Sequence, residues 1–191
     1  MQNNGTLVNP DTLNESALLQ QVRDGNQNAF RILMERHMKQ AYNVAYGFVQ
    51  DRDDADDIAQ EAFVNVYRSL HSFRGDSAFA TWLHRIVTNL SLSRMKQRNK
   101  EQSRRANVEE ADSTHAPAPG QSTETRAHIE RALHELPTLQ RVVVLLRHFE
   151  GLSTAQVSKA LSCSEAAVKT HLFRGLKKMK ERLSYLEADV S

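Results

Sequence analysis

Apolar side chains recur along this chain at the spacing of an α-helix. Between residues 58 and 70 they fall at i, i+1, i+4, i+5, i+8, i+9 and i+12, which would place them on one stripe of a helix. The 191 residues include only seven Gly and four Pro, too few for the many tight turns of a β-sandwich or barrel. The pattern therefore predicts an all-α protein.

One stretch without helical or strand period interrupts this pattern. From about Glu101 to Thr125 the chain holds Pro117, Pro119 and Gly120 among Ser, Thr, Ala and Glu, a composition typical of a flexible linker. We therefore expect two small helical domains, at residues 14–98 and 126–186, joined by a linker at 99–125. Residues 1–13 and 187–191 are expected to be tails.

Helix-capping residues predict where several helices begin. Asn26 would cap a helix that runs to about Val49, and Asp76 or Ser77 would cap one that runs to Arg98. In the second half, Pro137 would open a helix that Gly151 ends. A capping box of Ser153 and Gln156 would open a short helix to Leu161. A turn at 162–164 and a long final helix to about Leu183 would complete a helix-turn-helix.

Charge is segregated along the chain, although the net charge is only +2. Residues 51–61 carry a net charge of −5, whereas residues 85–105 carry +6 and residues 169–182 carry +5. One acidic and two basic patches indicate two kinds of partner.

The final helix has the features of a major-groove reading helix. Small residues, Ala166 and Ala167, stand at its start, and polar, basic and aromatic residues follow on one face. That face would hold Lys169, Thr170, Phe173, Arg174 and Lys177. Its buried stripe would be Val168, Leu172 and Leu176. The competing interpretation is a solvated lysine-rich surface helix.

A second line of side chains suits single-stranded nucleic acid. Trp82, Arg85, Asn89, Ser93 and Lys96 would share one face of the helix that precedes the linker. An aromatic ring with an amide and cations can stack unpaired bases and neutralise phosphates. The competing interpretation is a half-buried core Trp among solvated cations.

We find no residues that indicate catalysis, a metal or a cofactor. The single cysteine, Cys163, excludes an internal disulfide and a cysteine-based zinc site, and no HExxH or glycine-rich phosphate loop is present. No apolar run approaches the roughly 20 residues of a membrane helix, and the N-terminus lacks a signal pattern. We expect a cytoplasmic protein without a small-molecule substrate and without direct membrane insertion.

Taken together, these segments resemble bacterial sigma factors of the sigma-70 family. Residues 53–63, DDADDIAQEAF, are similar to sigma region 2.2, and residues 73–83, FRGDSAFATWL, followed by Arg85, Ile86 and Asn89, are similar to regions 2.3 and 2.4. Leu136-Pro137, Glu150 to Ser153 and the final helix are similar to region 4. With only regions 2 and 4 and a short linker, the chain resembles the extracytoplasmic-function (ECF) group.

The resemblance implies partners and residue roles. The partners would be core RNA polymerase (its β′ clamp helices and β subunit), promoter DNA, and an anti-sigma factor that can hold the protein at the inner membrane. Polymerase binding would fall to Asp57, Gln60 and Glu61. Recognition of the −10 element would fall to Phe73, Arg74, Asp76, Ser77, Trp82, Arg85 and Asn89. Recognition of the −35 element would fall to Arg147, Ser164, Lys169, Thr170, Phe173 and Arg174.

The recognition helix departs from the family pattern. Ala166-Ala167-Val168 stands where Gly-Thr-Val is usual, and Thr170-His171 stands where Ser-Arg is usual. Residues 168–172 also resemble the helix of LuxR-type regulators, so the alternative function is a helix-turn-helix transcription regulator that does not join polymerase. That alternative leaves the 73–83 segment unexplained. An enzyme, the third class considered, has no residues to support it.

Overall fold

The computed structural model describes residues 14–105 and 124–188, and it describes side chains for residues 14–101 and 127–184. Every regular element in these ranges is a helix, which confirms the all-α prediction. The central part of the expected linker and both chain ends lie outside the described residues.

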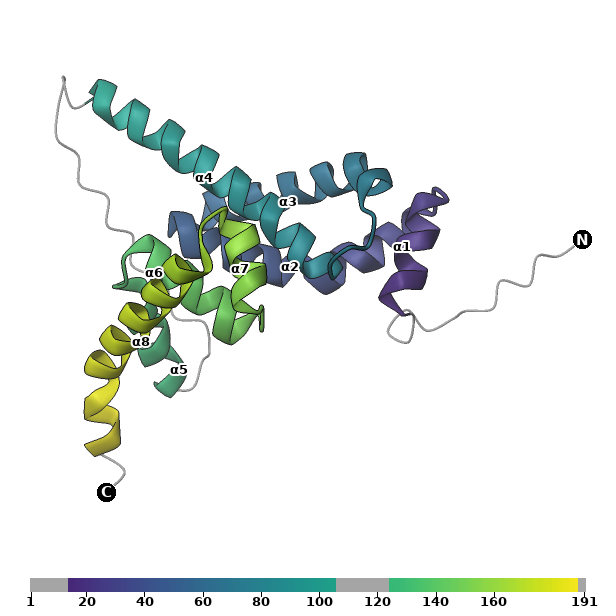
Figure 1. Ribbon diagram of the computed structural model, residues 1–191. Helices are drawn as coiled ribbons and strands as arrows, with labels where there is room; N and C mark the ends of the chain where they lie inside the picture. The colour runs from purple at the N-terminus through teal and green to yellow at the C-terminus, as the bar shows by residue number, and fades with distance from the viewer. Residues whose placement is uncertain (1–13, 106–123, 189–191) are drawn as a thin grey trace, which may run out of the picture.

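The N-terminal half is a bundle of helices around one apolar core. Its elements are α1 (Glu15–Arg23), α2 (Gln27–Val49), α3 (Arg52–Ser69), the short 3-10 helix η2 (Leu70–Ser72) and α4 (Phe79–Arg105). Helix α2 lies against α1, α3 and α4, and the end of α4 projects from the body of the molecule (Figure 1). The apolar stripe of α3 faces this core, except that Tyr67, expected inside, is 53% exposed.

Side-chain caps fix the starts of the first three helices. Asn26 accepts hydrogen bonds from the backbone N–H groups of Asn28 and Ala29, as the sequence predicts. Asn14 and Asp51 cap α1 and α3 in the same way. Helix α1 was not among the elements expected from the sequence.

The expected bounds of α4 are wrong at both ends. Neither Asp76 nor Ser77 is at the cap position, because α4 begins at Phe79 and its first turn bonds to the carbonyl of Ala78. The helix then continues past Arg98 to Arg105, into the segment expected to be linker.

The C-terminal half is a second set of helices that ends in the helix-turn-helix. Its elements are α5 (Glu124–His134), α6 (Thr138–Val144), the π-helical turn η3 (Leu145–Phe149), α7 (Thr154–Leu161) and α8 (Glu165–Ala188). Helix α8 ends several residues later than expected and packs on α5, α6 and α7. Gly175 makes the close approach to α6, since a Cβ there would lie 2.9 Å from Cγ2 of Val144.

The two halves are packed together, which the sequence did not predict. Helices α6 and α7 lie against α2 and α4 (Figure 1). One cluster of buried apolar side chains continues from the first half into the second, where it includes Val142, Val143, Leu146, Leu152, Val157 and Val168. The expected domains therefore share part of their core.

Candidate nucleic-acid interface

Helix α3 presents an exposed polar face. Its start is fixed by Asp51, which accepts from the backbone N–H of Asp54. One turn further on, the predicted polymerase-binding residues Asp57, Gln60 and Glu61 are all exposed. Arg94 of α4 lies 3.3 Å from Asp54 and 3.9 Å from Asp57, so the basic helix partly balances the acidic one.

The same face of α3 becomes apolar toward its end. Val64 is 47% exposed and Tyr67 is 53% exposed, at i+4 and i+7 from Gln60. An acidic patch that continues into exposed apolar side chains is suited to a protein surface rather than to DNA. This apolar part could not be recognised in the sequence because the helical period assigned Tyr67 to the core.

An aromatic cluster anchors the loop between η2 and α4. The ring of Phe73 lies 5.0 Å from that of Trp82 and 6.1 Å from that of Phe79, measured between centroids. Arg23 of α1 donates a hydrogen bond to the Phe73 carbonyl. The loop is therefore tied to α1 and α4, while Gly75 adopts a positive φ of 80° at its tip.

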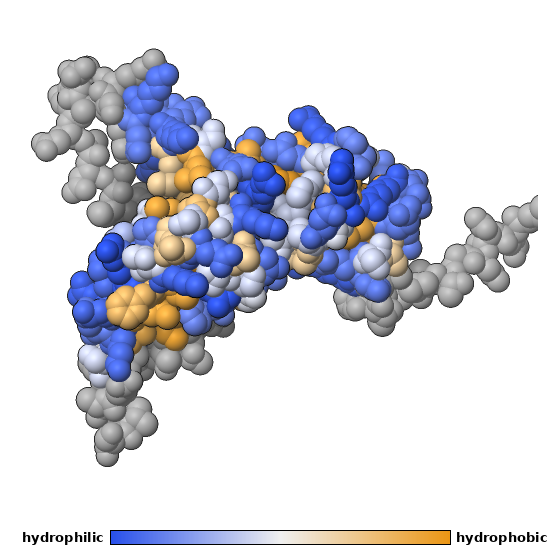
Figure 2. All heavy atoms as spheres, viewed as in Figure 1, coloured by the Kyte–Doolittle hydropathy of each residue, from blue (hydrophilic) through white to orange (hydrophobic). Residues whose placement is uncertain are grey.

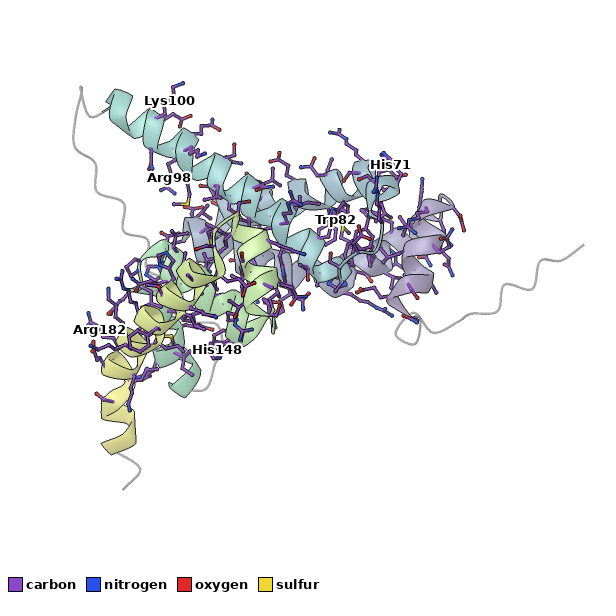
Figure 3. All side chains as sticks on the ribbon, viewed as in Figure 1. His71, Trp82, Arg98, Lys100, His148 and Arg182 are labelled. Carbon is purple, nitrogen blue, oxygen red and sulfur yellow. The ribbon has the colours of Figure 1, made fainter. Side chains whose placement is uncertain are left out.

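The anchored loop displays some of its predicted −10 residues and buries another. Arg74, Asp76 and Ser77 are exposed. Phe73 is only 7% exposed, so in this conformation its ring supports the loop and is not available to touch DNA. Trp82 is half-buried in the aromatic cluster, and it lies at the loop end of α4 (Figure 3).

The outer face of α4 continues from this loop as a polar and basic strip. Arg85, Asn89, Ser93 and Lys96 are exposed along it. Further basic residues, Arg98 and Lys100, lie near the projecting end of the helix (Figure 3). The structure thus exposes five of the seven predicted −10 residues on the loop and the helix that follows it, with Trp82 half-buried and Phe73 buried beneath them.

The helix-turn-helix of α7 and α8 has well-defined local geometry. Ser153 and Gln156 form the predicted capping box, with bonds of 3.2 Å and 2.7 Å. Ser162 takes a left-handed conformation in the turn, with φ of 51°. Ser164 accepts from the N–H of Ala167, which caps α8. Its hydroxyl is therefore engaged in the fold as well as exposed.

The predicted reading face of α8 is open. Lys169 and Arg174 are exposed, and Phe173 is 70% exposed. Thr170 is exposed too, but its hydroxyl donates 2.9 Å to the carbonyl of Ala166. Leu176, expected in the buried stripe, is 39% exposed.

Arg147 differs from the other predicted −35 residues. Its side chain is half-buried, and its guanidinium donates to the carbonyl of Leu152. Arg147 therefore holds the turn that leads into α7, and only part of its side chain is accessible.

Apolar side chains are also exposed in the C-terminal half. Phe149 is 56% exposed and Leu139 is 44% exposed, and orange surface gathers over α8 on the face shown in Figure 2. The sequence did not point to Phe149 or Leu139, because single apolar residues outside a helical stripe give no signal.

Two other properties bear on function. Within residues 14–105 and 124–188, no helix combines the length and apolar character needed to cross a membrane. In the same part of the chain, no group of three His, Cys, Asp or Glu side chains could hold a metal ion.

Comparisons with known proteins agree with this arrangement. Residues 33–101 match the family model for sigma-70 region 2, and residues 126–179 match the model for sigma-70 region 4. The chain is 32% identical over 183 residues to the RNA polymerase sigma-H factor of Pseudomonas aeruginosa, covering 90% of this chain and 95% of that protein. It is 30% identical over 175 residues to the ECF RNA polymerase sigma-E factor of Escherichia coli K12, covering 86% and 91%.

Solved structures share the fold. CnrH in complex with the cytosolic domain of CnrY is 27% identical, with a TM-score of 0.60 over 91% of this chain and 97% of that chain. The sigma factor RpoE of Bartonella quintana, solved with the anti-sigma factor NepR, has a TM-score of 0.69 at 22% identity over 81% and 96%, and it supports the fold alone.

The chain belongs to the sigma-70 family of RNA polymerase sigma factors, in its extracytoplasmic-function group. Proteins of this family are transcription initiation factors and not enzymes. The match to region 2 accounts for the 73–83 segment, which the LuxR-type alternative left unexplained.

Proposed function

We propose that this sigma factor uses three of the surfaces described above for three separate tasks. The face of α3 with Asp57, Gln60 and Glu61 docks on the β′ clamp helices of core polymerase. The loop at 73–78 and the outer face of α4 capture the opened −10 strand. The outer face of α8 reads the −35 element as duplex DNA.

The observation that carries this proposal is the continuity of the −10 surface. The exposed loop residues Arg74, Asp76 and Ser77 lead directly onto Arg85 and Asn89 of α4, and aromatic packing holds the loop in place. Unpaired bases gain stacking and polar contacts on such a surface that a closed duplex does not offer. Strand opening is therefore favoured by binding energy.

An anti-sigma factor is the second partner that we propose. Two structural relatives were solved with their own partners, NepR and the cytosolic domain of CnrY. In this chain, exposed apolar residues on both halves, Tyr67 and Phe149 among them, offer surfaces for a partner or for the polymerase β subunit. We place the protein in the cytoplasm, where polymerase is, with retention at the inner membrane through such a partner.

The first test reverses charge on the α3 face. Asp57→Arg with Glu61→Arg should weaken binding to core polymerase in a pull-down and lower run-off transcription in proportion, because both side chains are exposed on the face proposed to dock. The matched control is Asp24→Arg with Glu35→Arg, the same charge change at exposed sites away from α3. Normal core binding by the α3 variant would refute the assignment of this face.

A further inference from the structure

The loop at 73–78 is fastened at its two ends. At the first end, the N–H of Phe73 donates 3.1 Å to the carbonyl of Leu70, and the Phe73 ring packs in the aromatic cluster. At the second end, the carbonyl of Ala78 accepts from two N–H groups of the first turn of α4, at 3.0 Å and 3.3 Å. Residues 74–77, between these ends, are all exposed.

The tip of the loop stands clear of the rest of the molecule. A Cβ placed on Gly75 would meet no heavy atom of the described residues within 4 Å, its chain neighbours aside. Because the tip has no neighbours to fix it, the conformation of the loop depends on how well its two ends are held.

Arg23, in the last turn of α1, reaches the first end of the loop. Its Nη2 donates a hydrogen bond to the carbonyl of Phe73, although 50 residues of sequence separate the two. Figure 1 shows α1 beside the segment that leads from η2 to α4. With this bond, the N–H, the ring and the carbonyl of Phe73 are all engaged. A hydrogen bond from a charged donor is stronger than one between neutral groups.

The start of α1 reaches the second end of the loop through α2. Glu15 Oε2 lies 2.8 Å from Nε2 of His37, and Gln40 Oε1 lies 2.9 Å from Nδ1 of the same ring. His37 is buried, and its ring meets that of Phe79 edge-on, with the centroids 5.0 Å apart. Phe79 is the first residue of α4, directly after Ala78. Glu15 therefore orients the ring against which the second end of the loop packs.

The anchoring of α1 itself does not require these polar contacts. Its buried residues Leu18, Leu19 and Val22 belong to the apolar core that α2 shares. A basic residue at the end of a helix also complements the helix dipole, but that effect does not need a bond to Phe73. The match to sigma-70 region 2 begins only at residue 33, so it does not account for α1. The two contacts to the loop need another explanation.

A fixed loop has an advantage in binding unpaired bases. A loop that is ordered only when DNA binds loses conformational entropy at that moment, and the loss is subtracted from the binding free energy. The exposed side chains of Arg74, Asp76 and Ser77 keep their spacing before DNA arrives if both ends of the loop are held.

We propose that α1 is a positioning element for the −10 loop and that Arg23 is the residue through which it holds the first end. Arg23 acts through the Phe73 carbonyl and has no need to touch DNA, while Glu15 supports the second end through His37. This inference rests on the proposed function for its consequence in promoter opening, whereas the anchoring is a property of the free chain.

The first experiment measures the anchoring in the free chain. Trp82 is the only tryptophan, and its ring lies 5.0 Å from that of Phe73, so its fluorescence reports on the first end of the loop. Arg23→Met removes the donor and keeps the side-chain length. It should increase quenching of Trp82 by acrylamide and shift the emission to the red. Arg23→Lys, which keeps a cationic donor, should lie closer to the wild type.

The matched control is Arg31→Met, which removes the same charge at an exposed site on α2 where the arginine pairs with Glu35. Its quenching and emission should equal those of the wild type. Wild-type quenching in Arg23→Met would overturn the anchoring.

The second experiment measures promoter opening by the holoenzyme, on a promoter that the wild type uses in run-off transcription. Arg23→Met should lower the equilibrium constant for opening, followed by permanganate reactivity, about three- to tenfold, the range that one net hydrogen bond covers. Arg23→Lys should recover part of the loss, and Arg31→Met should match the wild type. Binding to core polymerase and to −35 duplex, and the melting temperature, should not change, which a merely structural role does not predict. Normal opening by Arg23→Met would refute the positioning role.

A loop variant separates this inference from the proposed function. Arg74→Ala with Ser77→Ala removes exposed loop side chains and leaves Phe73 and Arg23 in place. If this variant opens the promoter normally, the loop does not capture the strand, and the proposed function fails together with the role of Arg23 in opening. Quenching then still decides whether Arg23 holds the loop. If the loop variant is defective and Arg23→Met is not, the proposed function stands and the positioning role is wrong.

Discussion

His84 is a fully buried histidine without a hydrogen-bond partner among the described residues, so it carries an electrostatic cost. Burial, with a smaller effect from nearby His37, lowers the pKa of His84 to about 4. Glu150 beside it has a raised pKa, chiefly because it too is buried. Burial therefore disfavours the charged form of both side chains in the folded chain.

We expect the stability of the folded chain to fall as pH drops from about 6.5 toward 4. In that window the unfolded histidine binds a proton and folded His84 does not, which removes up to about 1.4 kcal/mol per pH unit. Glu150 acts in the opposite direction, since its raised pKa favours the folded state as pH falls through it. The two contributions partly cancel in the wild type.

A variant without His84 separates the contribution of His84 to the pH dependence of stability from that of Glu150. With His84→Leu, the free energy of unfolding, measured with urea, should no longer fall between pH 7 and pH 5.5, because only the opposite contribution of Glu150 remains. The exposed His148→Leu should leave the slope unchanged. An equal slope in wild type and His84→Leu would contradict this account.

Asn89 gives the cleanest test of the −10 surface at single-residue scale, because it is exposed on α4 and has no core role. Asn89→Ala should reduce strand opening in permanganate footprinting and weaken discrimination among −10 variants, by about 1–3 kcal/mol for a lost base contact. Duplex −35 binding should be unchanged. Asn43→Ala, the same change on α2, is the control. Wild-type opening and selectivity in Asn89→Ala would remove α4 from strand reading.

The exposure of some residues could be predicted from the sequence, whereas the burial of others could not. The exposed polar residues of α3, α4 and α8 were predictable because polar side chains at helical spacing stand out against an apolar stripe. Arg141 and His84 were not, since a polar residue in a helix is normally assigned to the surface. Helices far away in the sequence contribute to the burial of both: the Gly47 carbonyl of α2 accepts from Arg141, and Glu150, just before α7, lies beside His84.

At the scale of elements, removing a contact from α8 should impair a different step of promoter recognition than removing one from α4. Arg174→Ala should weaken binding to a −35 duplex in a mobility-shift assay by about 1–3 kcal/mol, because the side chain is exposed on the face of α8 that we propose reads this element. The exposed Lys180→Ala, lower on the same helix, is the control. Equal loss on a pre-opened template without that element would contradict a specific role.

Helix starts marked by a capping side chain could be predicted, although the predicted start of α4 was wrong. Asn26 and the Ser153–Gln156 capping box begin helices through side-chain hydrogen bonds to the first turn, and Pro137 precedes α6 without such a bond. The ends of α4 and α8 were placed too early, since a polar helix end that leaves the core has no apolar signal to mark it.

At the scale of the whole molecule, one buried cluster should make the chain unfold as a unit. Calorimetry of the full chain should show a single transition, because Val142, Val143 and Leu146 share the core of the first half. Gly47→Leu should split it into two, because a Cβ at Gly47 would lie 2.5 Å from a side chain of η3, and Asn43→Leu should not. Two transitions in the wild type would mean that the halves are energetically independent.

The docking of the halves could not be read from the sequence. Each half shows apolar stripes that look sufficient for its own core, and a long polar stretch separates them. The spacing of apolar residues in α6 does not indicate that one side of this helix packs on α8 and another side on α2.

The π-helical turn η3 follows α6 and contains an extra residue. Glu150 N–H bonds to the Leu145 carbonyl five residues back, at 3.0 Å, so the turn holds one residue more than an α-helix would. Deleting one residue there, such as His148, would convert the wide turn to regular α-helical winding and leave the flanking segments facing nearly the same way, because the extra residue is contained within that single turn. When relatives are aligned, a one-residue gap at this position is therefore compatible with the same inner and outer side chains before and after it.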